Sequence, residues 1–256
     1  MRVKVHLSYD GTNFFGWQKQ AEDDQPTVQS EFESALKKLT GQTFKTQGSG
    51  RTDRGVHALD QVVHFDLNDQ ILFDHFDWVR GLNRFLPEDI RIQSASQIHP
   101  EFHATRSALS KTYIYQIQDG PSPNPLISRY SHWVMSPLDL EYLNELSQAF
   151  VGTHDFKSFQ TVGTELYTTV RTLTAFKWTR IEEHLIQVSI SGDGFLKQMV
   201  RNLMGTLLHQ YWKKPFTIKD MENLMDQKDR SKAYGTAPSK GLILSKVRYP
   251  QETLKT

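Results

Sequence analysis

The sequence predicts an α+β fold with a mainly antiparallel sheet. Segments with the period-two alternation of strands are joined both by short turns and by segments with helical spacing, and the two kinds do not alternate regularly. Regular alternation would instead favour a doubly wound parallel sheet. The 256 residues include 38% hydrophobic side chains and only 15 glycines and 10 prolines, so the chain can bury a core and is not of low complexity.

The N-terminal half combines strands with two helical patterns. Residues 3–9 (VKVHLSY) alternate as a strand and lead into a turn at residues 10–13 (DGTN). An amphipathic helix follows over residues 27–41, with Thr27 as its N-cap and Gly41 at its end. The remaining predicted elements are a short strand near Phe44, a glycine-rich loop over 48–55, the strand ALDQVVHFDL, a helix within DHFDWVRGLNRFLP that ends at Pro87, and the strand IRIQSASQI.

The C-terminal half shows the same mixture of elements. Its predicted elements are the strand YIYQIQ, the proline-rich loop GPSPNP, the helix LEYLNELSQAF, the strand pair TVRTLTAFKWTRI and LIQVSIS, the long helix FLKQMVRNLMGTLLHQYW and the final strand LILSKVRY. We therefore expect two α+β domains, an N-terminal one over residues 1–104 and a C-terminal one over residues 105–256.

The composition excludes several classes of chemistry. The chain has no cysteine, which excludes disulfides, a thiolate nucleophile, iron–sulfur clusters and cysteine-based zinc sites. Its ten histidines lack the spacing of metal ligands, so we expect no metal site. No apolar run approaches the ~18 residues of a membrane span, and we expect a cytoplasmic protein that does not contact a membrane.

The densest polar segment, GSGRTDRGVHA at residues 48–58, is the first candidate site. Its glycines allow a ligand to approach the backbone closely, and Asp53 stands among Arg51, Arg54 and His57. The alternative interpretation is a hairpin turn in which Asp-Arg-Gly serves only the turn. A dinucleotide-binding loop is excluded, because Asp53 stands where the third glycine of that fingerprint would be and a strand follows.

Two acid-free windows concentrate positive charge in a chain whose net charge is only +1. They would suit a surface that follows nucleic-acid phosphates, or they are ordinary solvated faces. Arg201, in the second window, lies at the margin of the apolar face of its predicted helix. It either extends its head into water or holds a carboxylate at the rim of a pocket. The windows are residues 34–52, with Lys37, Lys38, Lys45 and Arg51, and residues 194–219, with Lys197, Arg201, Lys213, Lys214 and Lys219.

Ten segments of the chain resemble, in the same order, the TruA family of tRNA pseudouridine synthases. They are SYDGTNFFGWQKQ, PTVQSEFESALKKLTG, GSGRTDRGVHALDQVVHF, LNRFLPEDIRI, FHA, KTYIY, GTHDFKSF, TVRTL, GDGFLKQMVRNLMGTLL and APSKGLIL. The GRTDRGVHA segment is highly specific for the family. Together the segments are spread along nearly the whole chain.

The resemblance implies site residues, a fold and a substrate. It places the catalytic aspartate at Asp53, the base-displacing arginine at Arg51, the active-site tyrosine at Tyr113 and the arginine that pairs with the aspartate at Arg201. Arg54 and His57 are expected to add substrate contacts. It further implies an α+β homodimer with a continuous, mainly antiparallel sheet and a basic cleft. The implied reaction is isomerisation of uridine to pseudouridine at positions 38 to 40 of tRNA, in the anticodon stem-loop, without a cofactor.

One segment departs from the family pattern. In FHATRSA, Thr105 replaces the usual arginine and Arg106 replaces an aromatic residue. If this segment were a strand, the shift by one position would turn the arginine to the opposite face and remove the contact that it makes in relatives.

The residues fit the implied chemistry. Because the chain offers no thiolate, the Asp53 carboxylate between Arg51 and Arg54 is the leading candidate to act on the uridine. Attack at C1′, attack at C6 and assisted elimination at the sugar all stay open. Tyr113 would stack on the uracil, and its hydroxyl could help to remove the C5 proton. Two other functions stay open: a non-catalytic tRNA-binding or RNA-folding protein on the same scaffold, and a nucleoside hydrolase that uses the same carboxylate.

Overall fold

The computed structural model describes residues 1–20, 25–68, 70–161, 163, 167–213 and 215–250. The chain divides into two compact units. The first comprises Met1–Leu109 and the segment that begins at Ile243, and the second comprises Ser110–Leu242. The domain limits expected from the sequence, 1–104 and 105–256, stay a prediction. The compact units differ from them in the last strand, which pairs with a strand of the first unit.

The sheet of the first unit is mixed and mainly antiparallel. The strands run in the order β4 (Ile90–Ile98), β1 (Arg2–Tyr9), β3 (His57–Asp66) and β10 (Leu242–Arg248). β1 is antiparallel to both of its neighbours, whereas β10 is parallel to β3. The two-residue strand β2 (Gln47–Gly48) adds to β3 in antiparallel register, Gly48 opposite Val63. This short pairing places the glycine-rich segment directly at the sheet.

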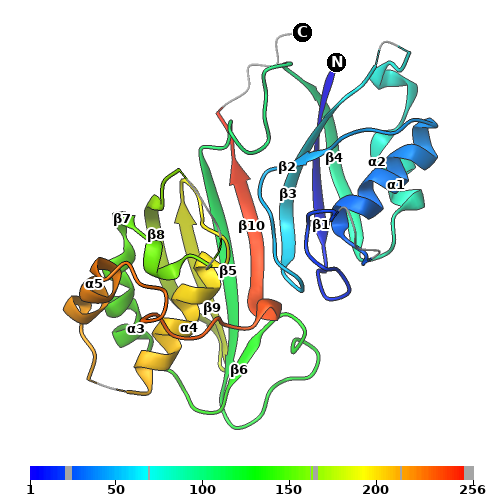
Figure 1. Cartoon of the computed structure of the whole chain (residues 1–256). Coiled ribbons are helices and arrows are strands. Elements are labelled where there is room, and N and C mark those ends of the chain that lie inside the picture. The colour runs from blue at the N-terminus through cyan, green and yellow to red at the C-terminus, as the bar shows by residue number, and fades with distance from the viewer. Residues whose placement is uncertain (21–24, 69, 162, 164–166, 214, 251–256) are drawn as a thin grey trace. The chain divides into compact units, whose positions relative to one another are not determined.

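Two helices cover the buried side of this sheet. Alternate side chains of β1 are buried, as the period-two pattern predicted. Helix α1 (Val28–Thr40) begins at Thr27, whose side chain accepts from the Ser30 amide, and ends at Gly41, whose φ is 76°. Helix α2 (Trp78–Phe85) packs against α1 and β4 (Figure 1). Phe32 of α1 meets Phe65 of β3, with ring centroids 6.2 Å apart.

The strands of the second unit are mainly antiparallel. The strands run in the order β5 (Ser110–Asp119), β9 (Leu185–Gly192), β8 (Val170–Glu182) and β7 (Gly152–Asp155). β8 and β9 form the predicted hairpin. The short strand β6 (His132–Val134) lies parallel to β5 after the proline-rich loop. The first residues of β5 belong to the KTYIY segment, so Tyr113 enters the sheet next to β9.

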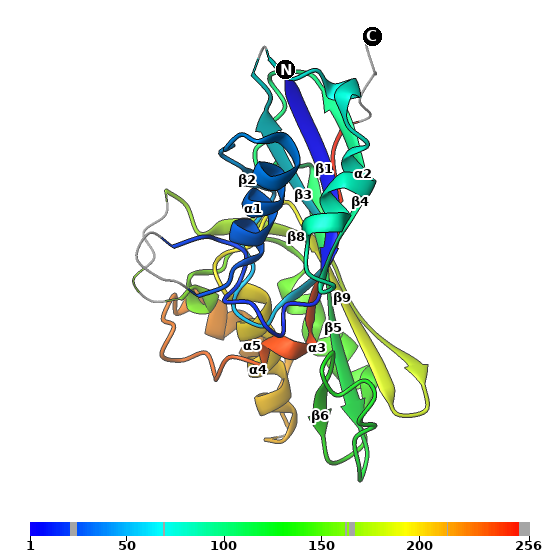
Figure 2. The same ribbon diagram turned by 90° about the vertical axis from the view of Figure 1, so that its right-hand side faces the viewer.

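Three α-helices accompany this sheet. They are α3 (Leu140–Ser147), α4 (Met199–Tyr211) and α5 (Ile218–Asp226). α3 packs against β8, α4 and α5, as Figures 1 and 2 show. Single 3₁₀ turns occur at Phe73–His75, Gln148–Phe150, Lys157–Phe159 and Ser239–Gly241. Within the described ranges, no helix is long and apolar enough to cross a membrane.

The α+β class with mainly antiparallel sheets is confirmed, and most predicted elements are present. Two details of the sequence prediction are wrong. The long helix begins at Met199 and not at Phe195, because Gln198 has a left-handed backbone with φ of 60°. The short strand expected near Phe44 lies instead at Gln47–Gly48. Helix α5 is an additional, unpredicted element, and it follows a capping box formed by Thr217 and Asp220.

Candidate active site

Asp53 lies in the loop that joins β2 to β3 in the first unit. Buried hydrogen bonds fix the base of this loop. The Ser49 hydroxyl donates to Gln61 Oε1 (2.6 Å), and Gln61 Nε2 donates to the Gly50 carbonyl (2.9 Å). Both Ser49 and Gln61 are completely buried. Since these buried polar groups satisfy one another, any shift of the loop base would leave one of them without a partner.

A second loop, residues 10–17, braces the middle of the Asp53 loop. The Tyr9 hydroxyl lies 2.8 Å from Thr52 Oγ1, and the Trp17 amide donates to the Thr52 carbonyl (3.1 Å). Burial raises the pKa of Tyr9 to about 12, so this phenol is neutral at pH 7. Gly16 has a φ of +91°, and a Cβ there would lie 2.5 Å from the Thr52 carbonyl oxygen. Only glycine allows the two loops to approach this closely.

The residues next to Asp53 form a tight turn that presents two arginines. The Val56 amide donates to the Asp53 carbonyl (3.1 Å), and Gly55 closes the turn with a φ of 74°. Asp53 is half-buried, whereas Arg51 and Arg54 are exposed. The Arg54 guanidinium lies 4.0 Å from the centre of the Phe15 ring. The loop between strands predicted for this segment is confirmed, and it holds a half-buried carboxylate between two exposed guanidinium groups.

His57, by contrast, is a buried residue at the start of β3. Its Nδ1 lies 3.0 Å from the Gly11 amide nitrogen and 3.0 Å from the Asp10 carboxylate. A Cβ on Gly11 would lie 2.0 Å from the Val56 carbonyl oxygen, so this turn presses directly on the end of the Asp53 loop. His57 therefore links the turn at residues 10–11 to the sheet, and its contact with substrate stays a prediction.

The segment FHATRSA is a turn and not a strand, so strand alternation does not decide where Arg106 points. The Thr105 hydroxyl donates to the Gly48 carbonyl (2.8 Å), directly before the Asp53 loop. The Thr105 and Arg106 amides both point at His103 Nδ1, at 3.2 and 3.3 Å. Arg106 itself is exposed. The residue that replaces the family's usual arginine thus ties this turn to the candidate catalytic loop.

A buried histidine also holds this turn. The Ala104 amide donates to His64 Nδ1 (3.2 Å). Burial and the positive charge of Arg2 lower the pKa of His64 to about 4. Its ring is therefore neutral at pH 7, as an acceptor must be. The hydrogen bonds of His64 and Thr105 could not be predicted from the sequence, because their partners lie more than 35 residues away along the chain.

Tyr113 occupies a buried position on β5 of the second unit. Its ring is 7% exposed and meets Phe195 edge to face, with centroids 5.0 Å apart and an interplanar angle of 82°. Tyr115, on the same side of the strand, donates its hydroxyl to the Pro238 carbonyl (2.9 Å). Burial raises the pKa of Tyr115, and the nearby charge of Arg201 opposes that shift. The two tyrosines share one buried face of β5, as residues two apart on a strand do.

Arg201 lies in the first turn of α4, half-buried at the margin of the apolar face as predicted. Its Nε donates to the Ala237 carbonyl (2.8 Å), and the Ala237 amide donates to the Arg201 carbonyl (3.0 Å). One turn farther on, a Cβ on Gly205 would lie 1.7 Å from the Gly235 carbonyl oxygen. The segment before β10 therefore lies directly on α4 and fixes the direction of the Arg201 side chain.

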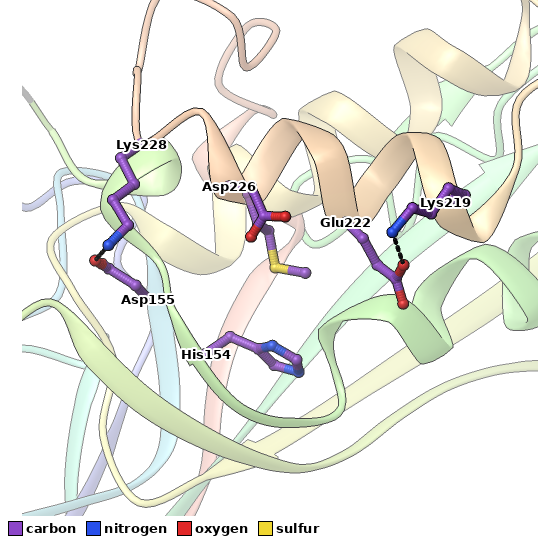
Figure 3. A pocket seen from close by; sticks show the side chains of 7 residues that line it. His154, Asp155, Lys219, Glu222, Asp226 and Lys228 are labelled. Atoms are coloured by element: carbon purple, nitrogen blue, oxygen red, sulfur yellow. Dashed lines mark hydrogen bonds and ion pairs between the residues drawn. The ribbon is translucent and has the colours of Figure 1, made fainter.

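A surface hollow of about 220 Å³ lies between β7 and α5 in the second unit, and its lining includes none of the predicted site residues (Figure 3). Four of the charged side chains that line it form ion pairs with one another. Lys228 pairs with Asp155 at 2.9 Å, and Lys219 pairs with Glu222 at 3.3 Å. His154 Nε2 lies 3.0 Å from the Val151 carbonyl. In the described part of the chain, no cluster of three or more histidine and acidic side chains is arranged to hold a metal ion.

Comparison with known proteins gives the same family as the sequence motifs. The family model described as tRNA pseudouridine synthase matches residues 6–105 and 146–250. The tRNA pseudouridine synthase A of Bdellovibrio bacteriovorus is 43% identical over 252 residues, which cover 98% of this chain and 96% of the relative. The chain belongs to the TruA family of tRNA pseudouridine synthases.

Other TruA relatives match over similar lengths. The tRNA pseudouridine synthase A of Maridesulfovibrio salexigens is 43% identical over 97% of this chain and 90% of its own length. The tRNA pseudouridine synthase A 2 of Clostridium tetani is 39% identical over 96% of this chain and 98% of its own. The ranges matched by the family model include the Asp53 loop, the FHA segment at residues 102–104, and α4 with Arg201. Tyr113 lies between the two matched ranges.

The structure places the predicted site residues in both units. Asp53, Arg51, Arg54 and His57 belong to the first unit, and Tyr113 and Arg201 to the second. Three of the predicted window lysines, Lys37, Lys38 and Lys45, are exposed on the first unit. Lys214 lies outside the described residues. The Asp53–Arg201 ion pair and the basic cleft stay predictions from the TruA resemblance.

Proposed function

We propose that this chain converts uridine to pseudouridine at positions 38 to 40 in the anticodon stem-loop of tRNA, with Asp53 as its catalytic carboxylate. Membership of the TruA family supports the reaction class. The assignment of Asp53 rests on the structure of its loop. It holds one half-buried carboxylate between exposed Arg51 and Arg54, and its base is fixed by buried hydrogen bonds.

The reaction is an isomerisation in which atoms balance without a co-reactant. The bond between C1′ and N1 breaks, the uracil turns, and C1′ bonds to C5. The C5 proton leaves and N1 gains a proton, so no group is imported and nothing is oxidised. A carboxylate fixed beside the sugar and base can act as nucleophile or stabilise the developing positive charge at C1′. The fixed Asp53 loop supports either role, since both require a preorganised anion.

Arg51 and Arg54 are suited to the RNA side of the reaction. Removing a paired base from a stem typically costs a few kcal/mol, and an inserted side chain can replace the lost stacking. A planar guanidinium can both stack and bind phosphate. We assign Arg51 to the space that the target base leaves, and Arg54 to the backbone beside it. His57 would act through the turn at residues 10–11, which it anchors.

Tyr113 and Arg201 complete the proposed catalytic set. The Tyr113 ring, held by its contact with Phe195, would stack on the uracil. Its hydroxyl would assist removal of the C5 proton. From the TruA resemblance, we assign Arg201 as the cation that keeps the Asp53 carboxylate ionised. The bond from its Nε to Ala237 supports this role, because it fixes the plane of the guanidinium.

The proposed partners follow from the same reaction. The substrate is tRNA, and a homodimer is proposed from the family resemblance alone. No cofactor is required by the chemical balance. The cytoplasm, which contains tRNA, is the proposed place of action.

The decisive experiment is position-resolved mapping of pseudouridine in tRNA treated with the purified chain. We expect modification at positions 38 to 40 and no free uracil. Asp53→Asn should reduce the rate by at least about 10³-fold, the scale seen when a nucleophile is removed. Asp74→Asn is the matched control, since Asp74 is an exposed aspartate of the same unit, on the 3₁₀ turn before α2.

Each other outcome contradicts a different part of the proposal. Free uracil would identify a hydrolase, and bound but unchanged tRNA would identify a binding protein. Normal pseudouridine formation by Asp53→Asn would overturn the role of Asp53 while leaving the enzyme class intact. Modification confined to positions outside 38 to 40 would leave the reaction but exclude the proposed substrate positions.

A further inference from the structure

A pair of cations lies beside Tyr113 that the proposed mechanism does not use. Lys111 and Tyr113 are two residues apart on β5, so their side chains point to the same side of the sheet. Along β9, Lys111 is opposite Gly192 and Tyr113 is opposite Ile190. The two Cα atoms are about 6.6 Å apart along the strand. Lys111 therefore lies nearer than Tyr113 to the end of the sheet where β9 ends and the loop before α4 begins.

Arg171, at the start of β8, reaches the same end of the sheet. Leu173 is opposite Gly192, which places Arg171 just beyond that glycine. A Cβ built on Gly194 would lie 3.4 Å from both Cδ and Nε of Arg171. Arg171 Nη1 donates to the Val170 carbonyl (2.5 Å) and to the Thr168 carbonyl (3.1 Å). The absence of a side chain on Gly194 leaves room there for the guanidinium.

The two cations lack a counter-ion within the described residues. Among these residues, no acidic side chain forms an ion pair with Lys111 or Arg171. Asp193, the nearest acid in the loop after β9, is exposed and accepts from the Thr172 amide (3.0 Å). Burial lowers the pKa of Lys111, and the charge of Arg171 lowers it further. Holding two cations together in this way costs free energy that a bound anion would recover.

We propose that Lys111 and Arg171 form a phosphate-binding subsite for the RNA backbone next to Tyr113. The inference rests on the proposed function, because tRNA is the polyanion that this function supplies. A guanidinium presents a planar fork to phosphate oxygens, and an ammonium adds a compact charge. The spacing of Lys111 and Tyr113 assigns the phosphate to the nucleotide stacked on Tyr113 or to its direct neighbour.

The first test replaces Lys111 with methionine, which keeps the length of the side chain and removes its charge. Lys111→Met should weaken binding of an anticodon stem-loop RNA about tenfold. It should also reduce the slope of log K against log[salt] by about 1, the signature of one lost phosphate contact. Lys177→Met is the matched control, since Lys177 is an exposed lysine of β8. It should leave both quantities unchanged.

Thermal unfolding separates a binding role from a structural role. A lysine kept for phosphate binding destabilises the fold without RNA, so Lys111→Met should melt at the same temperature as the unmodified chain or higher. Lys111→Arg, which keeps the charge, should retain the salt slope. A lower melting temperature together with an unchanged salt slope would show that Lys111 serves the fold, and would overturn the proposal.

A second test locates the phosphate. Stem-loop RNAs would carry a single uncharged methylphosphonate linkage at each phosphate flanking the target uridine. At one linkage, removing the phosphate charge should weaken binding by the protein without substitutions but should not weaken binding by Lys111→Met any further. Such non-additive losses are the signature of a direct contact between Lys111 and that phosphate. Additive losses at every flanking linkage would overturn the proposal. These binding results are independent of turnover. If pseudouridine forms but the affinity losses from Lys111→Met and the methylphosphonates are additive, only the phosphate subsite is contradicted. If the losses are non-additive but no pseudouridine forms, only the proposed reaction is contradicted.

Discussion

Single hydrogen bonds between distant residues determine where the Asp53 loop lies. Ser49 and Gln61 hold its base, and Thr52 is held by Tyr9 and Trp17. Thr105 reaches the same loop from the turn at residues 104–107 and donates to Gly48. Of these contacts, that of Thr105 is the one most open to a clean test, because its side chain is exposed and can be changed without opening a cavity.

Thr105→Val should lower kcat several-fold and leave KM for tRNA nearly unchanged. The substitution keeps the shape of the side chain and removes the donor to Gly48, so the loop loses one restraint at an expected cost of about 0.5–1.5 kcal/mol in stability. Steady-state kinetics with tRNA would measure the effect.

Thr105→Ser is the control for this prediction, since it keeps the hydroxyl and should behave as the unmodified chain. A serine variant as slow as the valine variant would mean that the Thr105 methyl group matters and the hydrogen bond does not. A valine variant with normal kcat would show that the bond to Gly48 does not restrain the loop during catalysis.

The residues of the candidate site were predictable to different degrees. Asp53 with Arg51 and Arg54 could be selected because loop glycines and alternating charges stand together in one segment. Lys111 and Arg171 could not be paired from the sequence, since they are 60 positions apart and only the β5–β9–β8 register brings them to the same end of the sheet. The loop restraints from Thr105 and Gln61 were hidden for the same reason.

At the scale of elements, α4 and the segment before β10 position Arg201 together. Ala237 exchanges two hydrogen bonds with Arg201. Asn202 Oδ1 accepts from Thr236 (2.7 Å) and from Arg230 (3.1 Å), so the segment is attached to the next residue of the helix as well. The close approach requires a glycine on α4, and Gly205 provides it.

Gly205→Ala should therefore reduce both stability and activity. The new Cβ would lie 1.7 Å from the Gly235 carbonyl oxygen, so the segment must move away from α4 and take Ala237 with it. Overpacking of this kind costs typically about 1–3 kcal/mol, despite the higher helix propensity of alanine. Thermal melting and the rate of pseudouridine formation would both be measured.

Gly235→Ala is a control on the other side of the same contact. Apart from its own and its two adjacent residues, no heavy atom of the described residues lies within 4 Å of the position that its Cβ would take, and its φ is outside the left-handed range. It should melt and react as the unmodified chain does. If Gly205→Ala were equally harmless, the segment would not need α4 to hold Arg201 in place.

Elements were predictable where local signals agree with packing. Helix α1 has its N-cap at Thr27, its left-handed end at Gly41 and an apolar stripe between them, so its limits follow from the sequence. The apolar pattern that begins at Phe195 continues into α4, but the left-handed backbone of Gln198 separates Phe195 from the helix. This break could not be predicted, because glutamine does not favour a left-handed conformation. Helix α5 did carry a signal in the sequence, the capping box formed by Thr217 and Asp220.

At the scale of the whole molecule, the net charge of +1 conceals an uneven distribution of ion pairs. Acidic residues neutralise lysines outside the first window, as in Lys19–Glu33 and Lys228–Asp155. In the described ranges, Lys37, Lys38 and Lys45 form no ion pair and are exposed. These lysines are therefore available to RNA phosphates, whereas paired lysines would have to give up a carboxylate first.

This distribution predicts a steep salt dependence of tRNA binding despite the near-neutral chain. If six phosphates are contacted, affinity should fall about a thousandfold between 50 and 200 mM salt. The triple variant Lys37→Gln, Lys38→Gln, Lys45→Gln should lower the slope of log K against log[salt] by about 2–3.

The matched control for this prediction removes three lysines that are already paired with acids. Lys19, Lys219 and Lys228 lie 3.9, 3.3 and 2.9 Å from Glu33, Glu222 and Asp155. The variant Lys19→Gln, Lys219→Gln, Lys228→Gln has the same net charge as the first triple variant but should keep most of the slope. Equal losses in the two variants would mean that total charge and not the exposed window governs binding. A flat salt dependence of the unmodified chain would contradict phosphate binding by either set of lysines.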